Sequence, residues 1–190
     1  RDTDRSRGLG DVYKRQIQRN AERILQLVNQ LMDIRKIDKG QMSLIFKKAE
    51  IVSFTRNLLE TFEQQTRIKK LDLKFHTSAP EIEMWIDPKN FDKIILNLLS
   101  NACKFTPENG QVEISLNTGE DTSLPPNAPL RRYVELTVTD SGIGIASTER
   151  EHIFERFYQI RNSQNNSNVG TGIGLHLTHS LVCLLYTSPS

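Results

Sequence analysis

Two asparagines and a lysine share one face of the helix predicted for NLLSNACKF, residues 97–105. Asn97 and Asn101 are four residues apart, which places their side chains about 6 Å from each other on a helix, and Lys104 follows one step further along. Asparagine is a poor helix former, because its amide competes with the backbone for hydrogen bonds. Two amide oxygens and an ammonium group would suit a magnesium ion bound to phosphate. An ordinary solvated polar face remains the alternative.

A second candidate is DSGIGI, residues 140–145, where Asp140 ends an alternating strand and Gly142 and Gly144 follow. Glycine permits positive φ and lets the backbone approach a flat ligand closely. A buried carboxylate at this point could accept a hydrogen bond from an exocyclic amino group such as that of adenine. Taken by itself, the segment is also consistent with a turn that has an acidic end.

The third candidate is GTGIGL, in which Gly170, Gly172 and Gly174 open a helical pattern. Free N–H groups and the positive dipole end of a helix would favour phosphate there. The segment does not match GxGxxG, because Leu175 and Leu177 stand where a third glycine is needed and no predicted strand precedes it. The sequence also contains no GxxxxGK[ST] motif, so a dinucleotide-binding fold and a P-loop are both disfavoured.

Helices and strands that could position these residues follow from the apolar periodicity. We predict helices over residues 16–40, 52–67 and 88–105, a short helical stretch over 149–157 and a last helix after GTGIGL. Alternation predicts strands at 42–51, 71–75, 111–117 and 133–140, and a short extended segment ends at Asp87-Pro88, which suits a helix start. Strands and helices do not alternate strictly, which indicates a mixed sheet covered by helices on one face.

Two of the predicted helices each have an apolar stripe that must pack against another element. The helix of NLLSNACKF has one apolar stripe, which consists of Phe91, Ile94, Ile95, Leu98, Leu99, Ala102 and Phe105. The first helix also has one stripe, which includes Ile17, Ile24, Leu25, Val28, Leu31 and Met32. The stripe of the first helix either packs within this domain or belongs to one arm of a helical hairpin or dimer bundle.

Composition excludes several classes of protein. The 190 residues suffice for one domain with a core and a small helical appendage, and 25 basic residues nearly balance 23 acidic ones. This net charge of +2 offers no electrostatic argument for nucleic acid. Cys103 and Cys183 have no CxxC spacing, so neither a disulfide framework nor a zinc site is indicated. No apolar run approaches the roughly 20 residues that a membrane-spanning helix needs.

Four motifs together carry a family resemblance. NLLSNACKF, DSGIGI, IFERFYQI and GTGIGL occur in this order, with a polar variable segment before the last. The series closely resembles the N, G1, F and G2 boxes of sensor histidine kinases, and LMDIRKIDKGQM resembles the second helix of their dimerisation and phosphoacceptor hairpin. The resemblance implies the α/β sandwich of the histidine kinase, gyrase, Hsp90 and MutL-type ATPases, preceded by one long helix.

The resemblance also implies a role for each candidate residue in binding ATP. Asn97 and Asn101 would hold Mg²⁺, and Lys104 would neutralise phosphate charge. Asp140 would bind the amino group of adenine. The other implied contacts are Phe105, Gly142 and Gly144 at the base, Phe154 and Phe157 as anchors of a mobile lid that includes NSQNNSN, and Gly170, Thr171, Gly172 and Gly174 at the phosphates.

The chain departs from the family pattern in two respects. The family phosphorylates a histidine on the first hairpin helix, and none of His76, His152, His176 and His179 has that context, so we expect no catalytic residue in this chain and no activity of the fragment alone. A metal site at His176 and His179 is disfavoured because no third ligand accompanies them. The family's sheet also continues after the GTGIGL helix, so we expect an unpaired sheet edge here.

We therefore expect residues 16–40 to be a partial dimerisation and phosphoacceptor helix and residues 41–182 to be a truncated ATP-binding domain. Residues 1–15 and 183–190 resemble translated adapter sequence and are expected to be non-native flanks. The expected partners are the parent's phosphoacceptor hairpin, a response regulator receiver domain and, in the full-length parent, a second copy. The expected setting is the cytoplasmic portion of a membrane-anchored bacterial sensor, which resembles hybrid kinases more than simple ones.

Two other functions remain open at this point. One is a nucleotide-binding regulatory module that performs no phosphotransfer. The other is an ATPase of the gyrase or MutL kind. IFERFYQI and the hairpin-like helix favour the kinase over such an ATPase, because neither feature belongs to those enzymes.

Overall fold

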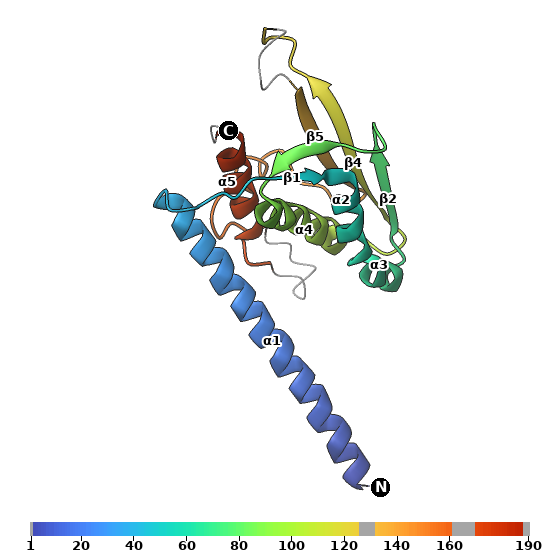
Figure 1. The fold of residues 1–190 in the computed structure, drawn as a ribbon. Helices are drawn as coiled ribbons and strands as arrows, with labels where there is room; N and C mark the ends of the chain where they lie inside the picture. The colour runs from blue at the N-terminus through green and yellow to red at the C-terminus, as the bar shows by residue number, and fades with distance from the viewer. Residues whose placement is uncertain (1, 126–131, 161–169, 188–190) are drawn as a thin grey trace.

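The computed structural model describes residues 2–125, 132–160 and 170–187. Its elements are α1 (Asp2–Asp38), β1 (Lys47–Glu50), α2 (Ile51–Glu60), α3 (Glu63–Lys69), β2 (Asp72–Thr77), β3 (Glu83–Ile86), α4 (Pro88–Phe105), β4 (Gln111–Glu120), β5 (Arg132–Asp140) and α5 (Gly174–Thr187). The elements after α1 form one domain, from which the N-terminal part of α1 projects (Figure 1). Among the described residues, no helix is both long and apolar enough to cross a membrane.

The larger sheet is mixed and has the strand order β2-β4-β5. β2 and β4 are parallel, with Leu73 opposite Val112, whereas β4 and β5 are antiparallel, with Val112 opposite Asp140. β1 and β3 form a separate antiparallel pair. This topology confirms the predicted mixed sheet, and β5 forms one edge of it within the part of the chain that the structure describes.

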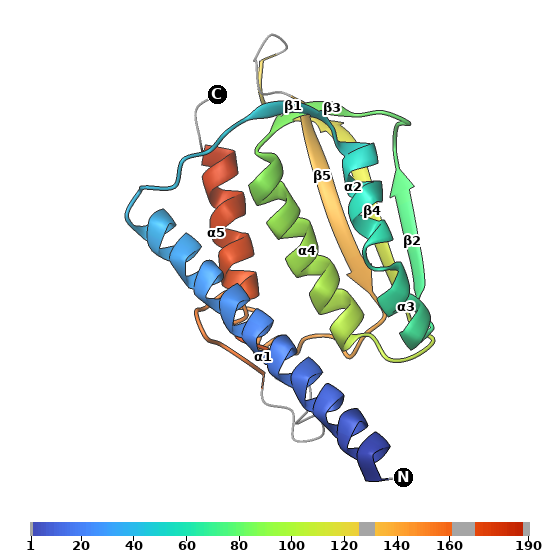
Figure 2. The same cartoon turned by 60° about the horizontal axis from the view of Figure 1, so that its bottom comes forward.

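Helices cover one face of the larger sheet. Figure 2 shows α2, α4 and α5 as a layer in front of the strands, with α1 lying across α5. Val112 and Ile114 of β4 are fully buried and pack in one cluster with Ile95 and Leu99 of α4. Each such side chain contributes about 1.5–3 kcal/mol when it is removed from water. This packing fixes α4, and with it the predicted polar face, against the sheet.

Local sequence explains where α4 begins. The Oδ1 atom of Asp87 accepts a hydrogen bond from the backbone N–H of Asn90 at 3.0 Å, and Pro88 occupies the first turn. The other carboxylate oxygen accepts from the N–H of Ile45 at 2.8 Å. A capping carboxylate followed by proline is a favourable helix start, so the predicted start at Asp87-Pro88 is confirmed.

The apolar stripe of α4 packs against two different parts of the domain, the sheet on one side and α1 and α5 on the other. Ile95 and Leu99 face the sheet, whereas Ile94 and Leu98 pack in a second cluster with residues of α1 and α5. Phe105, at the end of the stripe, is 43% exposed. α4 is therefore the central element between the sheet and α5.

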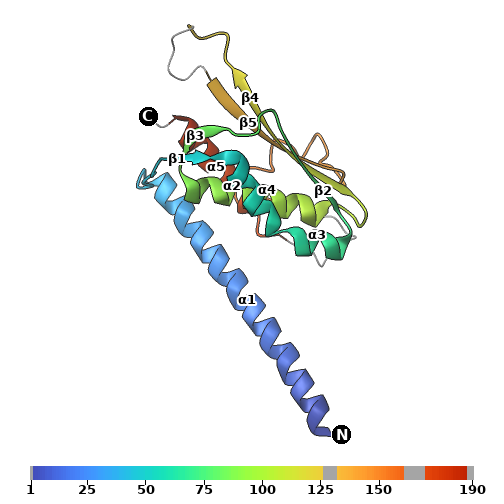
Figure 3. The ribbon, with the colours of Figure 1, turned by 45° about the vertical axis from the view of Figure 1, so that its right-hand side comes forward.

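The first helix extends further than predicted, because α1 begins at Asp2 rather than near residue 16. Near its C-terminal end, Ile34 is buried and packs with Leu177 and Leu181 of α5. Figure 3 shows the rest of α1 leading away from the domain. Several apolar side chains of α1 are accordingly exposed in this chain, and these are Ile17, Ile24, Leu25, Val28, Leu31 and Met32.

Two other predicted elements need correction. The strand predicted at 42–51 is shorter in the structure, where β1 covers Lys47–Glu50. The helix predicted over 52–67 divides into α2 and α3, because the N–H groups of Thr61 and Phe62 bond to carbonyls three residues back, and Phe62 is buried. The last helix, predicted to follow GTGIGL, is α5, Gly174–Thr187.

The helix predicted over 149–157 is wrong as well. This segment forms consecutive turns, in which the N–H of His152 bonds to Glu149 and that of Glu155 bonds to His152. One bond joins residues four apart, from Ile153 to Glu149. Bonds between residues three apart do not build the ladder of an α-helix. The segment ends at Phe157, whose φ of +63° is incompatible with a right-handed helix.

Candidate nucleotide-binding site

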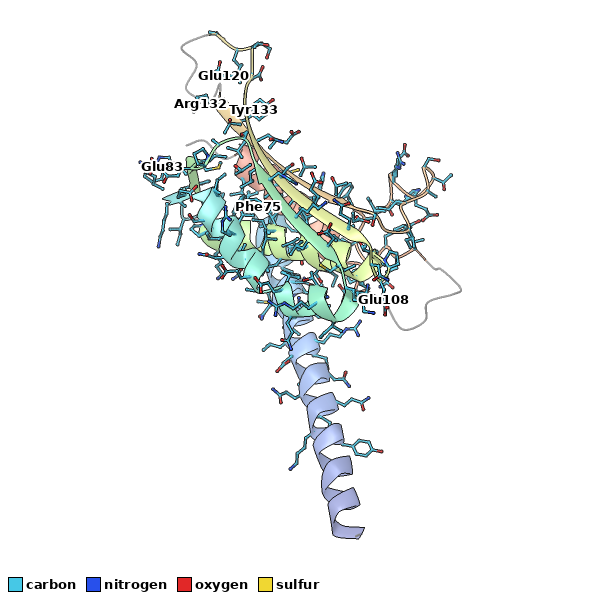
Figure 4. All side chains as sticks on the ribbon, turned by 90° about the vertical axis from the view of Figure 1, so that its right-hand side faces the viewer. Phe75, Glu83, Glu108, Glu120, Arg132 and Tyr133 are labelled. Carbon is cyan, nitrogen blue, oxygen red and sulfur yellow. The ribbon has the colours of Figure 1, made fainter. Side chains whose placement is uncertain are left out.

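The predicted site residues gather at one end of the domain. Figure 2 shows the C-terminal ends of α4 and β5 and the N-terminal end of α5 at the same end of the helical layer. Figure 4 labels Glu108, just after α4, at the opposite end of the sheet from Glu120, Arg132 and Tyr133, which lie at the far end of the β4–β5 hairpin. The three motifs on α4, β5 and α5 are therefore brought together by the topology.

Asn97 contacts the first turns of α5. Its Nδ2 atom donates hydrogen bonds to the carbonyl oxygen of Gly174 at 3.4 Å and to Oγ1 of Thr178 at 3.3 Å. A Cβ atom at Gly174 would lie 3.6 Å from Oδ1 of Asn97. The amide nitrogen is thus bound to protein, and the amide oxygen is the atom that a cation could use. Asn101 lies one turn further along α4 and is half-buried.

Lys104 lies beside the glycine segment that precedes α5. A Cβ atom at Gly170 would lie 3.3 Å from its Nζ atom, and this Nζ is 4.8 Å from the ring centre of Phe105. Burial lowers the pKa of Lys104, and the positive charge of Arg23 lowers it further. An ammonium group that is partly desolvated next to a like charge gains from a bound anion. This position therefore suits a phosphate.

The turn at Asp140 packs against the end of α4. The N–H of Gly142 donates to Oδ1 of Asp140 at 2.8 Å. A Cβ atom at Gly142 would lie only 2.7 Å from the carbonyl oxygen of Phe105, so this close approach requires glycine. Asp140 itself is exposed, which corrects the prediction of a buried carboxylate. Gly144 has a φ of +67°, and no atom lies within 4 Å of the Cβ position there.

The two phenylalanines of IFERFYQI lie in different surroundings. The ring of Phe154 lies 5.2 Å, centre to centre, from that of His179, and the two ring planes are tilted by 38°. Phe157 has an exposed side chain, but its backbone contacts Gly172 closely. A Cβ atom at Gly172 would lie 2.5 Å from the carbonyl carbon of Phe157. Gly172 therefore serves backbone packing against Phe157, a role that the sequence did not indicate.

Sequence reasoning also missed a polar link that joins α1 to α5. Nε of Arg156 donates to Nε2 of His176 at 2.9 Å, and the guanidinium group also pairs with Asp38 at the end of α1. Nδ1 of His176 lies 2.8 Å from the carbonyl oxygen of Phe154. Both ring nitrogens of His176 therefore contact the segment that contains Phe154 and Arg156. Nothing in the sequence pairs Arg156 with Asp38, which lies 118 residues earlier.

An apolar cavity of about 350 Å³ lies between α1 and the segments that contain Phe157 and Ile173. Its lining residues are Val28, Leu31, Met32, Ile34, Arg35, Arg156, Phe157 and Ile173. It is next to the predicted nucleotide site but does not include its polar residues. The predicted polar lid segment, residues 162–168, lies outside the described residues.

The donor set at this end of the domain fits a magnesium ion that arrives with its ligand. Among the described residues, no group of three or more His, Cys, Asp or Glu side chains could hold a metal. Asn97 and Asn101 supply neutral amide oxygens, and Mg²⁺ commonly completes its shell with water and substrate phosphates. Thr171 contributes locally, because its Oγ1 accepts from the N–H of Ile173 at 3.3 Å. The same finding gives no support to a metal site at His176 and His179.

Comparisons with known proteins agree with this geometry. The family described as "Histidine kinase-, DNA gyrase B-, and HSP90-like ATPase" matches residues 86–187. The sensor histidine kinase TmoS of Ectopseudomonas mendocina is 36% identical over 166 residues, which are 87% of this chain and 16% of TmoS. The chain spans between 10% and 33% of the length of the curated relatives that we compared.

Two solved structures share the fold. The catalytic domain of histidine kinase ThkA, in a nucleotide-free form, matches with a TM-score of 0.59 and 23% identity over 73% of this chain and 82% of that chain. Full-length ShkA, solved with AMPPNP, matches with a TM-score of 0.66 and 25% identity over 84% of this chain and 30% of that chain. The named relatives are histidine kinases, which favours this branch over a gyrase-like or MutL-like ATPase. The chain belongs to the histidine kinase-, DNA gyrase B- and HSP90-like ATPase family, and it is an ATP-binding catalytic domain of the histidine kinase type.

Proposed function

We propose that this domain binds Mg-ATP where the C-terminal ends of α4 and β5 meet the N-terminal end of α5. It would present the γ-phosphate to a histidine on another helix. One observation carries the proposal. Asn97 and Lys104, from opposite ends of the NLLSNACKF motif, lie against Gly174 and Gly170 of the motif that opens α5. Amide oxygen, ammonium group and the backbone N–H groups before α5 thus converge, and these are the groups that a triphosphate with its cation needs.

Each residue has a role in this proposal. Asp140 orients the nucleotide by accepting a hydrogen bond from the adenine amino group, and Phe105 borders the base. Lys104 neutralises phosphate charge, and the glycines before α5 present N–H groups to the phosphates. Asn97 and Asn101 hold Mg²⁺ through their amide oxygens. When bound, Mg²⁺ would supply positive charge at the phosphates as charge moves during transfer.

The chemistry in the parent protein would be phosphoryl transfer. An imidazole nitrogen of the acceptor histidine forms a bond to the γ-phosphorus, the bond from this phosphorus to the β,γ-bridging oxygen breaks, and ADP leaves. The acceptor imidazole loses its N–H proton to a base of its own helix. Positioning and charge neutralisation supply most of the catalysis in such transfers. This domain's contribution is therefore the orientation of ATP.

Partners of the parent follow from the same proposal. ThkA has been solved in complex with response regulator protein TrrA, and one relative is named hybrid signal transduction histidine kinase D. We propose that the parent acts on a receiver domain, forms a homodimer through a bundle that includes α1, and is anchored to a membrane. The exposed apolar side chains of α1, such as Ile24 and Leu25, support a helical partner at this helix.

A mixing experiment tests the proposed transfer. The chain is incubated with γ-labelled ATP, Mg²⁺ and a separate helical hairpin that carries a phosphoacceptor histidine from a related kinase. We expect acid-labile, base-stable label on the hairpin and none on the chain alone. Label on His152, His176 or His179 of this chain would contradict the proposal. Tight Mg-ATP binding without any transfer would instead support a regulatory nucleotide-binding module.

A further inference from the structure

The last turn of α4 carries two residues of the proposed site, Lys104 and Phe105. The carbonyl groups at the end of a helix lack partners within the helix, and the turn frays unless other groups bind them. Thr106 provides one such group, because its N–H and its hydroxyl both donate to the carbonyl oxygen of Ala102, at 3.0 Å and 2.7 Å. The next carbonyls along the turn need a different donor.

Lys69, the last residue of α3, is that donor. Its Nζ atom lies 2.8 Å from the carbonyl oxygen of Cys103, 3.0 Å from that of Lys104 and 2.7 Å from that of Thr106. An ammonium group has three N–H donors, so these three bonds use its full capacity. A positive charge at the C-terminal end of a helix is also favoured by the helix dipole. Lys69 therefore closes the end of α4.

The backbone that carries Lys69 is itself held in place. The N–H of Lys70 bonds to the carbonyl oxygen of Arg67 at 3.1 Å, and the N–H of Leu71 bonds to that of Thr66 at 2.8 Å. Lys70 has a φ of +53°, and Leu71 is buried in the main core cluster. The backbone at Lys69 is thus held in place, which limits the positions that its ammonium group can take relative to α4.

The last turn of α4 contacts both the proposed phosphate region and the proposed adenine region. The Nζ of Lys104 lies against Gly170, before α5. The carbonyl oxygen of Phe105 abuts Gly142, whose N–H is bonded to Asp140. A shift of the α4 end would therefore displace the proposed phosphate contact and the proposed adenine contact together. Lys69 binds the backbone carbonyls of this turn and need not touch the nucleotide to affect it.

We propose that Lys69 is a positioning residue for nucleotide binding, which acts by fixing the last turn of α4 and so aiming Lys104 and Phe105. This inference rests on the proposed ATP site. It differs from a role in stability alone, because it requires the effect of Lys69 on ATP affinity to depend on Lys104.

Titration calorimetry with ATP and Mg²⁺ on the 190-residue chain tests the inference, with melting temperatures measured for every variant. Lys69→Met should weaken ATP binding about tenfold, since three hydrogen bonds from a charged group are lost. Lys69→Arg, which keeps charge and donors, should stay within about threefold of the parent. Lys48→Met is the matched control, because Lys48 pairs with Glu83 at the surface, and it should leave ATP affinity unchanged.

A double-mutant cycle separates positioning from other effects. With Lys104→Met already present, Lys69→Met should weaken ATP binding by less than about threefold, because its main target is gone. An unchanged ATP affinity of Lys69→Met, with only a lower melting temperature, would overturn the inference. The same tenfold loss in both backgrounds would also overturn it.

If the proposed function is wrong, the parent chain itself will not bind ATP in the titration, whereas if only the role of Lys69 is wrong, the parent chain will still bind it. Amide hydrogen exchange tests the structural premise of the inference, that Lys69 fixes the last turn of α4, whether or not ATP binds. Exchange at Lys104–Thr106 should accelerate in Lys69→Met and not in Lys48→Met if Lys69 fixes the turn. Equal exchange in both variants would overturn the inference.

Discussion

The backbone N–H of Phe157 donates a hydrogen bond to the carbonyl oxygen of Gly172 at 2.9 Å, and both residues have left-handed backbone conformations. The φ angles are +63° at Phe157 and +68° at Gly172. A left-handed conformation is costly for a residue such as phenylalanine and persists only where the surroundings impose it. The contact joins the segment after β5 to the segment that opens α5. It therefore fixes two sides of the proposed phosphate region relative to each other.

Replacing Gly172 with alanine should break this contact. The new Cβ atom would lie 2.5 Å from the carbonyl carbon of Phe157, so the backbone must move. Gly144→Ala is a matched control, because Gly144 has a φ of +67° and no atom within 4 Å of its Cβ position. In urea unfolding, Gly144→Ala should cost about 1 kcal/mol from backbone strain. Gly172→Ala should cost about 1–3 kcal/mol more from overpacking, and equal costs would contradict the close contact.

Glu50 should make stability depend on pH in the acid range. Burial acts to raise its pKa, but hydrogen bonds from Ile82, Ser53 and Val52 outweigh it and lower the pKa from 4.5 to about 2. Because the pKa is lowered in the folded state, the carboxylate stabilises the fold fully above pH 4.5 and loses this contribution as the pH falls towards 2. Urea unfolding from pH 6 to pH 3 should show a smaller difference between parent and Glu50→Gln at the acid end. A difference that is constant with pH would contradict the lowered pKa.

Asp140 should set the preference for adenine. Asp140→Ala should weaken ATP binding about tenfold. This loss is at the low end of the range for a hydrogen bond to a charged group, because the carboxylate is exposed. The parent should prefer ATP to GTP, whose base lacks the matching amino donor. Glu135→Gln, at an exposed position within β5, is the control and should bind ATP like the parent. Equal calorimetric affinities of the parent for ATP and GTP would refute the adenine contact.

The sequence predicted those parts of the site that depend on regular elements. Asp87-Pro88 marks the start of α4, and from there helical periodicity places Asn97, Asn101 and Lys104 on one face. Alternation in β5 likewise brings Asp140 to the end of a strand. These features follow from local sequence, because capping and periodicity act over a few residues.

Contacts between distant segments could not be predicted in this way. Arg156 pairs with Asp38 and His176, which belong to two different helices, and no local pattern encodes that choice. The left-handed φ of Phe157 has no sequence signal either, because phenylalanine normally avoids it. The composition of residues 149–157 suits a helix, but tertiary contacts override this preference and the segment forms turns.

The central claim is that α4 and α5 form a site for ATP with its magnesium ion, and Asn101→Ala tests it most directly. ATP is titrated into the parent and the variant, once with Mg²⁺ and once with a chelator. Asn57→Ala, an exposed asparagine on α2, is the control. We predict that Mg²⁺ strengthens ATP binding to the parent and to Asn57→Ala but has a much smaller effect on Asn101→Ala, whereas adenosine binds all three alike. An equal gain from Mg²⁺ in the parent and Asn101→Ala, or no ATP binding by the parent, would contradict the account.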